Sequence, residues 1–119
     1  ENIKTELKAI YEDDGINALR SAYTEKVPSL DKKVEDHWVL NVLGYEYLAE
    51  EDYTKALGVF DLNTRLHPRE ANVWDSLGEG FYESGDKQKA KAAFEQALSI
   101  KPKFWPSQNW LRRLASEDR

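Results

Sequence analysis

Apolar side chains recur along most of the chain every three or four residues, the spacing that places them on one face of an α-helix. Short breaks containing Gly, Pro or Asp interrupt this pattern. The pattern predicts an all-α fold of about seven helices, over residues 2–13, 15–26, 34–50, 53–66, 71–84, 87–100 and 105–117.

The predicted helix ends carry residues that suit them. Asp52 and Asp86 stand at equivalent places, where an aspartate side chain can accept a hydrogen bond from the first turn of the next helix. Gly85 is suited to the left-handed conformation that often ends a helix. Glu51 occupies the matching place in the preceding helix, so we expect a less regular turn there.

One pattern of eight positions occurs twice, 34 residues apart. In the second copy the positions hold Trp74, Leu77, Gly78, Phe81, Ala90, Phe94, Ala97 and Pro102. In the first copy they hold Leu40, Leu43, Gly44, Tyr47, Ala56, Phe60, Asn63 and Pro68. With this period and these residues, the chain resembles the tetratricopeptide repeat (TPR) family.

The resemblance implies a right-handed TPR solenoid of antiparallel helix pairs, forming a single domain over residues 1–119. Its expected parts are a helical pair or degenerate repeat (1–36), two repeats (37–70 and 71–104) and a capping helix (105–119). Signature residues are expected to pack rather than to bind. Gly44 and Gly78 should allow close helix contact, and Phe60 and Phe94 should wedge between neighbouring repeats.

Composition narrows the possible partners. The 17 basic and 22 acidic residues give a formal net charge of −5, which argues against nucleic-acid binding. No apolar run reaches the roughly 20 residues that span a bilayer, so we expect no membrane insertion. The chain contains no Met and begins at Glu1, so we expect it to be a processed or excised part of a longer protein.

No residues form a recognisable catalytic or metal-binding pattern. There is no Cys, and His37 and His67 lack a ligand at the spacing of a known metal motif. A nucleophile elbow of the Gly-x-Ser-x-Gly type is absent. We therefore expect a chain that is not an enzyme and that has neither a cofactor nor a metal ion.

The resemblance implies that ligands lie on the concave face lined by the first helix of each repeat. The residues that it places there are Trp38, Asn41, Tyr45, Leu48, Asn72, Asp75, Glu79, Tyr82, Asn109 and Arg113. Aromatic rings offer contact area and amides can pair with a peptide backbone. Asp75 and Glu79 favour a cationic or neutral ligand. The alternative is that this face packs on another domain or only meets solvent.

One TPR subgroup binds the C-terminal carboxylate of a chaperone through Lys, Asn and Arg side chains. The matching positions here hold Asn41, Tyr45, Ser76, Pro106 and Trp110. These positions lack the required positive charge, so we expect no chaperone docking of that kind.

Three strings resemble the short TPR tails found C-terminal to bacterial secreted serine hydrolases, either β-lactamase-like enzymes or α/β-hydrolase esterases. They are residues 40–45, 60–63 and 74–79, and they include the unusual Asn63. This resemblance implies a structural or assembly appendage that packs on its own upstream catalytic domain, in a periplasmic or secreted protein. Two functions therefore stay open, a peptide-binding module and such an appendage, and either is compatible with a homo-oligomer.

Overall fold

The computed structural model describes residues 2–27 and 37–118. Within these residues it contains seven helices and no strand, which confirms the predicted all-α fold. The helices are α1 (Ile3–Asp14), α2 (Ile16–Lys26), α3 (His37–Ala49), α4 (Tyr53–Leu66), α5 (Ala71–Ser84), α6 (Lys87–Ile100) and α7 (Trp105–Glu117). The predicted beginning of the third helix, at residues 34–36, lies outside the described residues.

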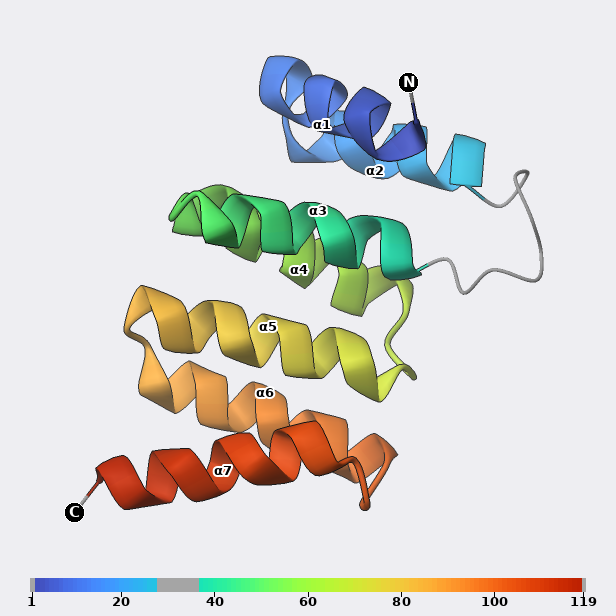
Figure 1. Cartoon of the computed structure of the whole chain (residues 1–119). Coiled ribbons are helices and arrows are strands. Elements are labelled where there is room, and N and C mark those ends of the chain that lie inside the picture. The colour runs from blue at the N-terminus through green and yellow to red at the C-terminus, as the bar shows by residue number, and fades with distance from the viewer. Residues whose placement is uncertain (1, 28–36, 119) are drawn as a thin grey trace.

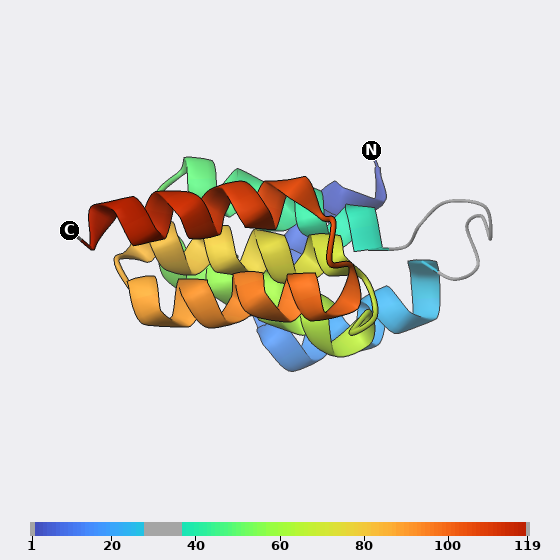
Figure 2. The ribbon, with the colours of Figure 1, turned by 90° about the horizontal axis from the view of Figure 1, so that it is seen from below.

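The helices stack as successive antiparallel neighbours into an elongated array of 46 × 29 × 21 Å (Figure 1). Seen along the stack, they form two layers (Figure 2). Helices α3, α5 and α7 lie in one layer, and α2, α4 and α6 lie in the other. Side chains from three helices that are distant in sequence therefore share one face of the molecule.

In both repeats a phenylalanine ring rests on a helical glycine. A Cβ atom added to Gly78 would lie 2.5 Å from Cε1 of Phe94, and one added to Gly44 would collide with the ring of Phe60 in the same way. Such a contact is too short for any side chain, so each glycine is required for packing. The predicted close approach at these positions is confirmed, and the neighbour that enforces it is the phenylalanine.

Phe60 and Phe94 also contact the next element, as the wedge role requires. A Cβ atom on Gly80, in the following repeat, would lie 3.0 Å from Cδ2 of Phe60. The Phe94 ring stacks on Trp110 of α7, with ring centroids 5.4 Å apart. Both phenylalanines are fully buried, so they join consecutive helix pairs through the core.

The turns that end α3 and α5 have the same geometry. Glu51 donates its backbone N–H to the Leu48 carbonyl, and Gly85 donates to the Tyr82 carbonyl, each at 3.0 Å. Gly85 has φ 96° and Glu51 has φ 59°, so both lie in the left-handed region. The prediction of a less regular turn at Glu51 was wrong: the turn is kept, and a residue with a side chain takes the unfavourable conformation.

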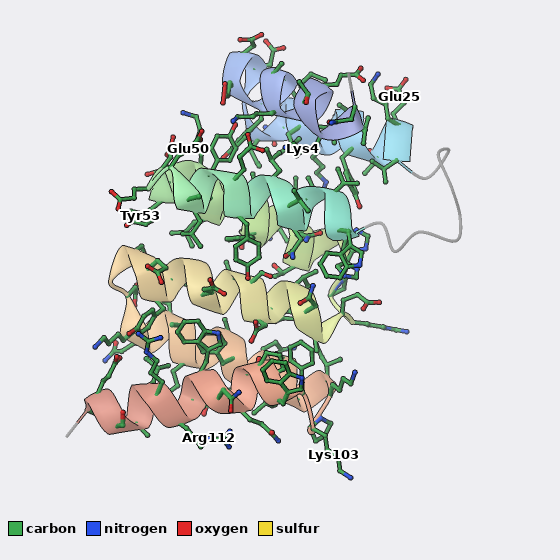
Figure 3. The ribbon with its side chains drawn as sticks, in the orientation of Figure 1. Lys4, Glu25, Glu50, Tyr53, Lys103 and Arg112 are labelled. Atoms are coloured by element: carbon green, nitrogen blue, oxygen red, sulfur yellow. The ribbon has the colours of Figure 1, made fainter. Side chains whose placement is uncertain are left out.

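The N-terminal pair packs on the first repeat with a buried interface and an ion-pair cluster. Leu7 of α1 and Leu19 of α2 are fully buried in the main core. On the other side of the interface, Lys4 and Lys8 each lie 2.6 Å from the carboxylate of Glu46 on α3, and Figure 3 shows Lys4 between these two helices. Their hydrogen bonds and positive charges lower the pKa of Glu46. The charge of Glu46 is thus neutralised within the molecule.

Candidate functional site

A hollow of about 330 Å³ lies between α5 and α7, on the layer that the sequence predicted to bind. We call it the acidic hollow; its lining residues are Asp75, Glu79, Trp105, Pro106, Asn109, Trp110 and Arg113. Four of these were predicted as candidates from sequence, and the structure brings those four together: Asp75, Glu79, Asn109 and Arg113.

Asp75 is the most deeply placed charge of the acidic hollow, with an exposed fraction of 6%. The hydroxyl of Ser107, a fully buried residue of α7, donates a hydrogen bond of 2.7 Å to Oδ1 of Asp75. Burial raises the pKa of Asp75, and the Ser107 bond opposes that rise. The ionised carboxylate is therefore held at a free-energy cost that one hydroxyl offsets only in part.

Glu79 lies one helical turn after Asp75 and is half-buried. The hydroxyl of Tyr45, on α3, donates a hydrogen bond of 3.0 Å to Oε1 of Glu79. Burial raises the pKa of Glu79, and the negative charge of Asp75 adds to the rise. Burial, together with the charge of Glu79, also raises the pKa of Tyr45 far above its ordinary value. Tyr45 therefore remains a neutral donor to this carboxylate.

Neither carboxylate forms an ion pair with a described basic side chain, in residues 2–27 or 37–118. Arg113, the cation on the wall of the hollow, is directed to other groups. Its Nε lies 3.5 Å from the Glu117 carboxylate, and its guanidinium lies 5.0 Å from the Tyr82 ring and 5.3 Å from the Trp110 ring. Tyr82 donates its hydroxyl to Glu117 as well, at 2.7 Å. Tyr82 and Arg113 thus belong to one network beside the hollow.

Two further candidates, Trp38 and Asn72, lie at the beginnings of α3 and α5. Trp38 and Asn72 line a second hollow of about 290 Å³, whose other lining residues are His37, Glu70, Ala71, Lys101 and Phe104. Asn41 is buried, with an exposed fraction of 4%. Leu48, by contrast, packs against the main hydrophobic core. Six of the predicted residues therefore line one of the two hollows, whereas Asn41, Tyr45, Tyr82 and the partly buried Leu48 line neither.

Two amide atoms on these helices are buried without a hydrogen-bond partner among the described residues. They are Oδ1 of Asn41, an acceptor, and Nδ2 of Asn72, a donor. A buried polar atom left unpaired costs about 1–3 kcal/mol, so its retention needs an explanation. A peptide group presents a donor and an acceptor, so a bound segment would supply both partners once the side chains that cover these atoms move aside.

Sequence reasoning missed three residues that shape the acidic hollow: Trp105, Trp110 as a wall, and Ser107. Trp105 has an exposed fraction of 68%, the highest among the large apolar side chains named as exposed. In the 34-residue numbering Ser107 corresponds to Val73, a fully buried position, so the repeat pattern gave no signal for its contact with Asp75.

The part of the chain that the structure describes contains neither a metal-binding cluster nor a membrane-spanning helix. No three His, Asp or Glu side chains gather there as a group able to hold a metal ion. None of the described helices combines the length and the apolar character that crossing a bilayer requires.

Residues 71–104 match the family model described as tetratricopeptide repeat. These residues are a tetratricopeptide repeat. Similar proteins include Superkiller protein 3 of Schizosaccharomyces pombe, 32% identical over 76 residues, and the peroxisomal targeting signal receptor of Saccharomyces cerevisiae, 29% identical over 62 residues. The matches cover 64% and 52% of this chain but only 6% and 10% of those proteins. The chain thus spans a small part of the length of these relatives.

Solved structures support the TPR assignment at the level of the fold. The first TPR of Spaghetti (RPAP3), bound to the HSP90 peptide SRMEEVD, aligns with a TM-score of 0.64 and 15% identity, over 96% of this chain and 88% of that one. The MamA R50E mutant aligns with a TM-score of 0.63 and 19% identity, over 96% of this chain and 78% of that one. The array is therefore a TPR-like helical solenoid.

Proposed function

We propose that the chain is a non-catalytic interaction module that holds an extended peptide or protein segment across the face formed by α3, α5 and α7. The observation that carries this proposal is the pair of unpartnered amide atoms, Oδ1 of Asn41 and Nδ2 of Asn72. One accepts and the other donates, which matches what a peptide backbone offers. Each is buried on the layer that the repeat pattern assigns to ligands.

Exposed aromatic side chains on the same helices add contact area for such a segment. Trp38 at the beginning of α3 is 48% exposed, and Trp105 at the beginning of α7 is 68% exposed. Large exposed aromatic rings are enriched where proteins bind other proteins. Among similar folds, one TPR is described as bound to an HSP90 peptide, and one relative is named a targeting signal receptor, so peptide recognition on this scaffold has precedent.

A peptide-display selection on the whole chain tests the proposal. We expect enriched peptides whose binding falls about tenfold or more when Asn41→Ala or Asn72→Ala removes an amide, because a backbone hydrogen bond in a buried site contributes about 1.4 kcal/mol. Gln88→Ala is the matched control, since it removes an exposed amide from α6 in the other layer. If no peptide is enriched, or if both amide variants bind as wild type does, the proposal fails.

A second candidate function is an appendage that packs on a catalytic domain of the same protein. The whole protein would then be a periplasmic or secreted bacterial hydrolase. The observation in its favour is the exposure of three apolar side chains on the α3 and α7 helices, Trp38, Val42 and Trp105. Deleting the segment from the full-length protein should then lower the melting temperature of the remainder or change its oligomeric state. An unchanged melting temperature and assembly would exclude this role.

Asn63, which suggested the hydrolase tails, has a local role in this fold. It is fully buried, and its Nδ2 donates a hydrogen bond of 3.0 Å to the His37 carbonyl at the beginning of α3. This bond gives Asn63 a local packing role, although its Oδ1 is buried without a partner among the described residues. The peptide-binding proposal does not depend on it.

A further inference from the structure

We infer that the acidic hollow binds a basic side chain, lysine or arginine, of the bound segment. This inference rests on the proposed function, since it assigns one ligand side chain to one part of the same face. It specifies a positively charged side chain on the peptide, whereas the amide atoms of Asn41 and Asn72 specify only backbone groups.

The first support is negative charge that the molecule does not neutralise. Asp75 and Glu79 lie on one face of α5 and both line the hollow. Asp75 receives one hydrogen bond from Ser107, and Glu79 receives one from Tyr45. Both donors are neutral hydroxyls, which leaves the net charge of the pair unchanged. The site therefore complements a positive charge from outside.

The nearby cations of α7 do not supply that charge. Arg113 is paired with Glu117 and lies over the rings of Tyr82 and Trp110. Arg112 donates to Oδ1 of Asn109 and points away from α5 (Figure 3). The carboxylates stay open towards the hollow, while Arg113 and Asn109 define its edge.

The second support is the depth of the carboxylates. Asp75 is 6% exposed, and Glu79 is half-buried. A carboxylate removed from water is destabilising unless it is paired, and a pairing in such a site is stronger than one at an open surface. A ligand cation would therefore gain more here than at a fully exposed carboxylate.

The third support is the aromatic wall. Trp105 and Trp110 line the hollow beside the two carboxylates. A guanidinium or ammonium group is attracted to the face of an indole ring. Arg113 already uses one face of Trp110 in this way, at 5.3 Å. Trp105 is mostly exposed, so its ring can pack against the charged group and the methylene chain of a ligand lysine or arginine.

The volume suits such a ligand group. At about 330 Å³ the hollow is at the lower end of the roughly 300–1,000 Å³ range of small-ligand sites. It can hold one long side chain with part of its backbone, and a carboxylate-bearing side chain would meet two like charges there.

The test is a peptide-display selection followed by calorimetry on the whole chain. We expect one position of the enriched peptides to hold lysine or arginine. Replacing that residue by its neutral analogue, norleucine for lysine or citrulline for arginine, should weaken binding at least tenfold. Glu79→Gln should weaken the original peptide similarly, because the amide keeps the shape and the acceptor for Tyr45 but removes the charge.

The two changes should not add. Once Glu79→Gln is present, the neutral peptide should bind no more than about threefold worse than the original peptide, since the lost partner is shared. Glu83→Gln is the matched control: it removes the same charge one turn further along α5, at an exposed residue. Asp75→Asn gives a second variant of the hollow, and thermal melting verifies that each variant folds.

The outcomes separate this inference from the proposed function. Enriched peptides with no basic preference, or with additive effects of Glu79→Gln and the neutral analogue, overturn the basic-side-chain pocket and leave the module standing. A selection that yields no binding peptide overturns both. Loss of binding in Glu83→Gln equal to that in Glu79→Gln would show general charge attraction and would also overturn the pocket.

Discussion

The helix pairs α3–α4 and α5–α6 have the same interior packing. Phe60 covers Gly44 in the first, and Phe94 covers Gly78 in the second, with the same short approach. Each second helix begins with an aspartate side chain that accepts a backbone N–H, Asp52 in α4 and Asp86 in α6. The caps were predicted from sequence and are confirmed.

The same two pairs differ on the outer face of their first helix. Asn41 and Tyr45 of α3 correspond to Asp75 and Glu79 of α5, so two neutral side chains are replaced by two carboxylates. The repeat keeps the residues that hold helices together and changes those that the proposed function assigns to a ligand. Differences between the copies are therefore more informative about binding than their similarities.

The largest expected effect comes from removing the shared phenylalanines. Phe60→Ala should lower the free energy of unfolding by about 3–5 kcal/mol, the usual range for a buried phenylalanine. Phe94→Ala should fall at the lower end of that range, because Phe94 belongs to the smaller buried cluster with Ala90 and Leu114. Urea unfolding at equilibrium measures both; equal losses would show that the two positions are energetically interchangeable.

Substituting the glycines beneath those rings tests the same ring–glycine contacts by adding a methyl group instead of removing the ring. Gly44→Ala and Gly78→Ala should each destabilise by about 1–3 kcal/mol through overpacking. In the Phe94→Ala background the ring is gone, so Gly78→Ala should become neutral or stabilising by up to about 1 kcal/mol, because alanine favours the helix. Unfolding curves of the four combinations check this. An unchanged cost in that background would mean that the glycine is required for another reason.

The packing was predictable because a helical interior repeats its spacing and tolerates few residue types. The predicted bounds of α4, α5 and α6 equal the observed bounds, and the predicted end of α3 is one residue beyond the observed end. The turn at Glu51 was predicted wrongly because propensity disfavours a positive φ there, while the packing on both sides of the turn imposes it.

The binding face was predictable only as a set of positions. Sequence placed Asp75 and Glu79 on the outer face of α5, but not their depth or their neutral donors. Ser107 and Trp105 come from α7, which packs on α6 through the stacked rings of Phe94 and Trp110, a contact between helices that sequence spacing does not specify. Whether the chain uses this face for a ligand stays a prediction.

Replacing the two carboxylates of α5 by amides gives this helix the uncharged outer side chains of α3, and so tests the difference between the two repeats. Burial raises the pKa values of Asp75 and Glu79, so their charged forms disfavour the folded state. Asp75→Asn with Glu79→Gln should therefore raise the melting temperature modestly at pH 7. At pH values below about 3, under the pKa values of the unfolded chain, the wild-type groups are protonated in both states, so the difference should disappear.

The pH dependence of a cation-paired carboxylate should have the opposite sign. Lys4 and Lys8 lower the pKa of Glu46, so this group stabilises the fold above the ordinary value of about 4.5 and loses that effect as the pH falls through its lowered pKa. Glu46→Gln should thus lower the melting temperature at pH 7 and converge with wild type in acid. Melting curves from pH 3 to pH 8 compare the variants. If both sets of substitutions changed the melting temperature in the same direction at pH 7, the proposed difference between the paired Glu46 and the unpaired Asp75 and Glu79 would be contradicted.

The smallest expected effect concerns the residue with positive φ in each turn, Glu51 in the first repeat and Gly85 in the second. Glu51 at φ 59° bears a strain of about 1–2 kcal/mol that Gly85 at φ 96° avoids. Glycine also loses about 0.5–1 kcal/mol more on folding because its unfolded chain is freer. Glu51→Gly should therefore stabilise by about 0.5 kcal/mol, and Gly85→Ala should destabilise by about 1 kcal/mol. Urea unfolding can resolve the sign of both changes. A loss of stability in Glu51→Gly would mean that the Glu51 side chain itself contributes more than its backbone strain costs.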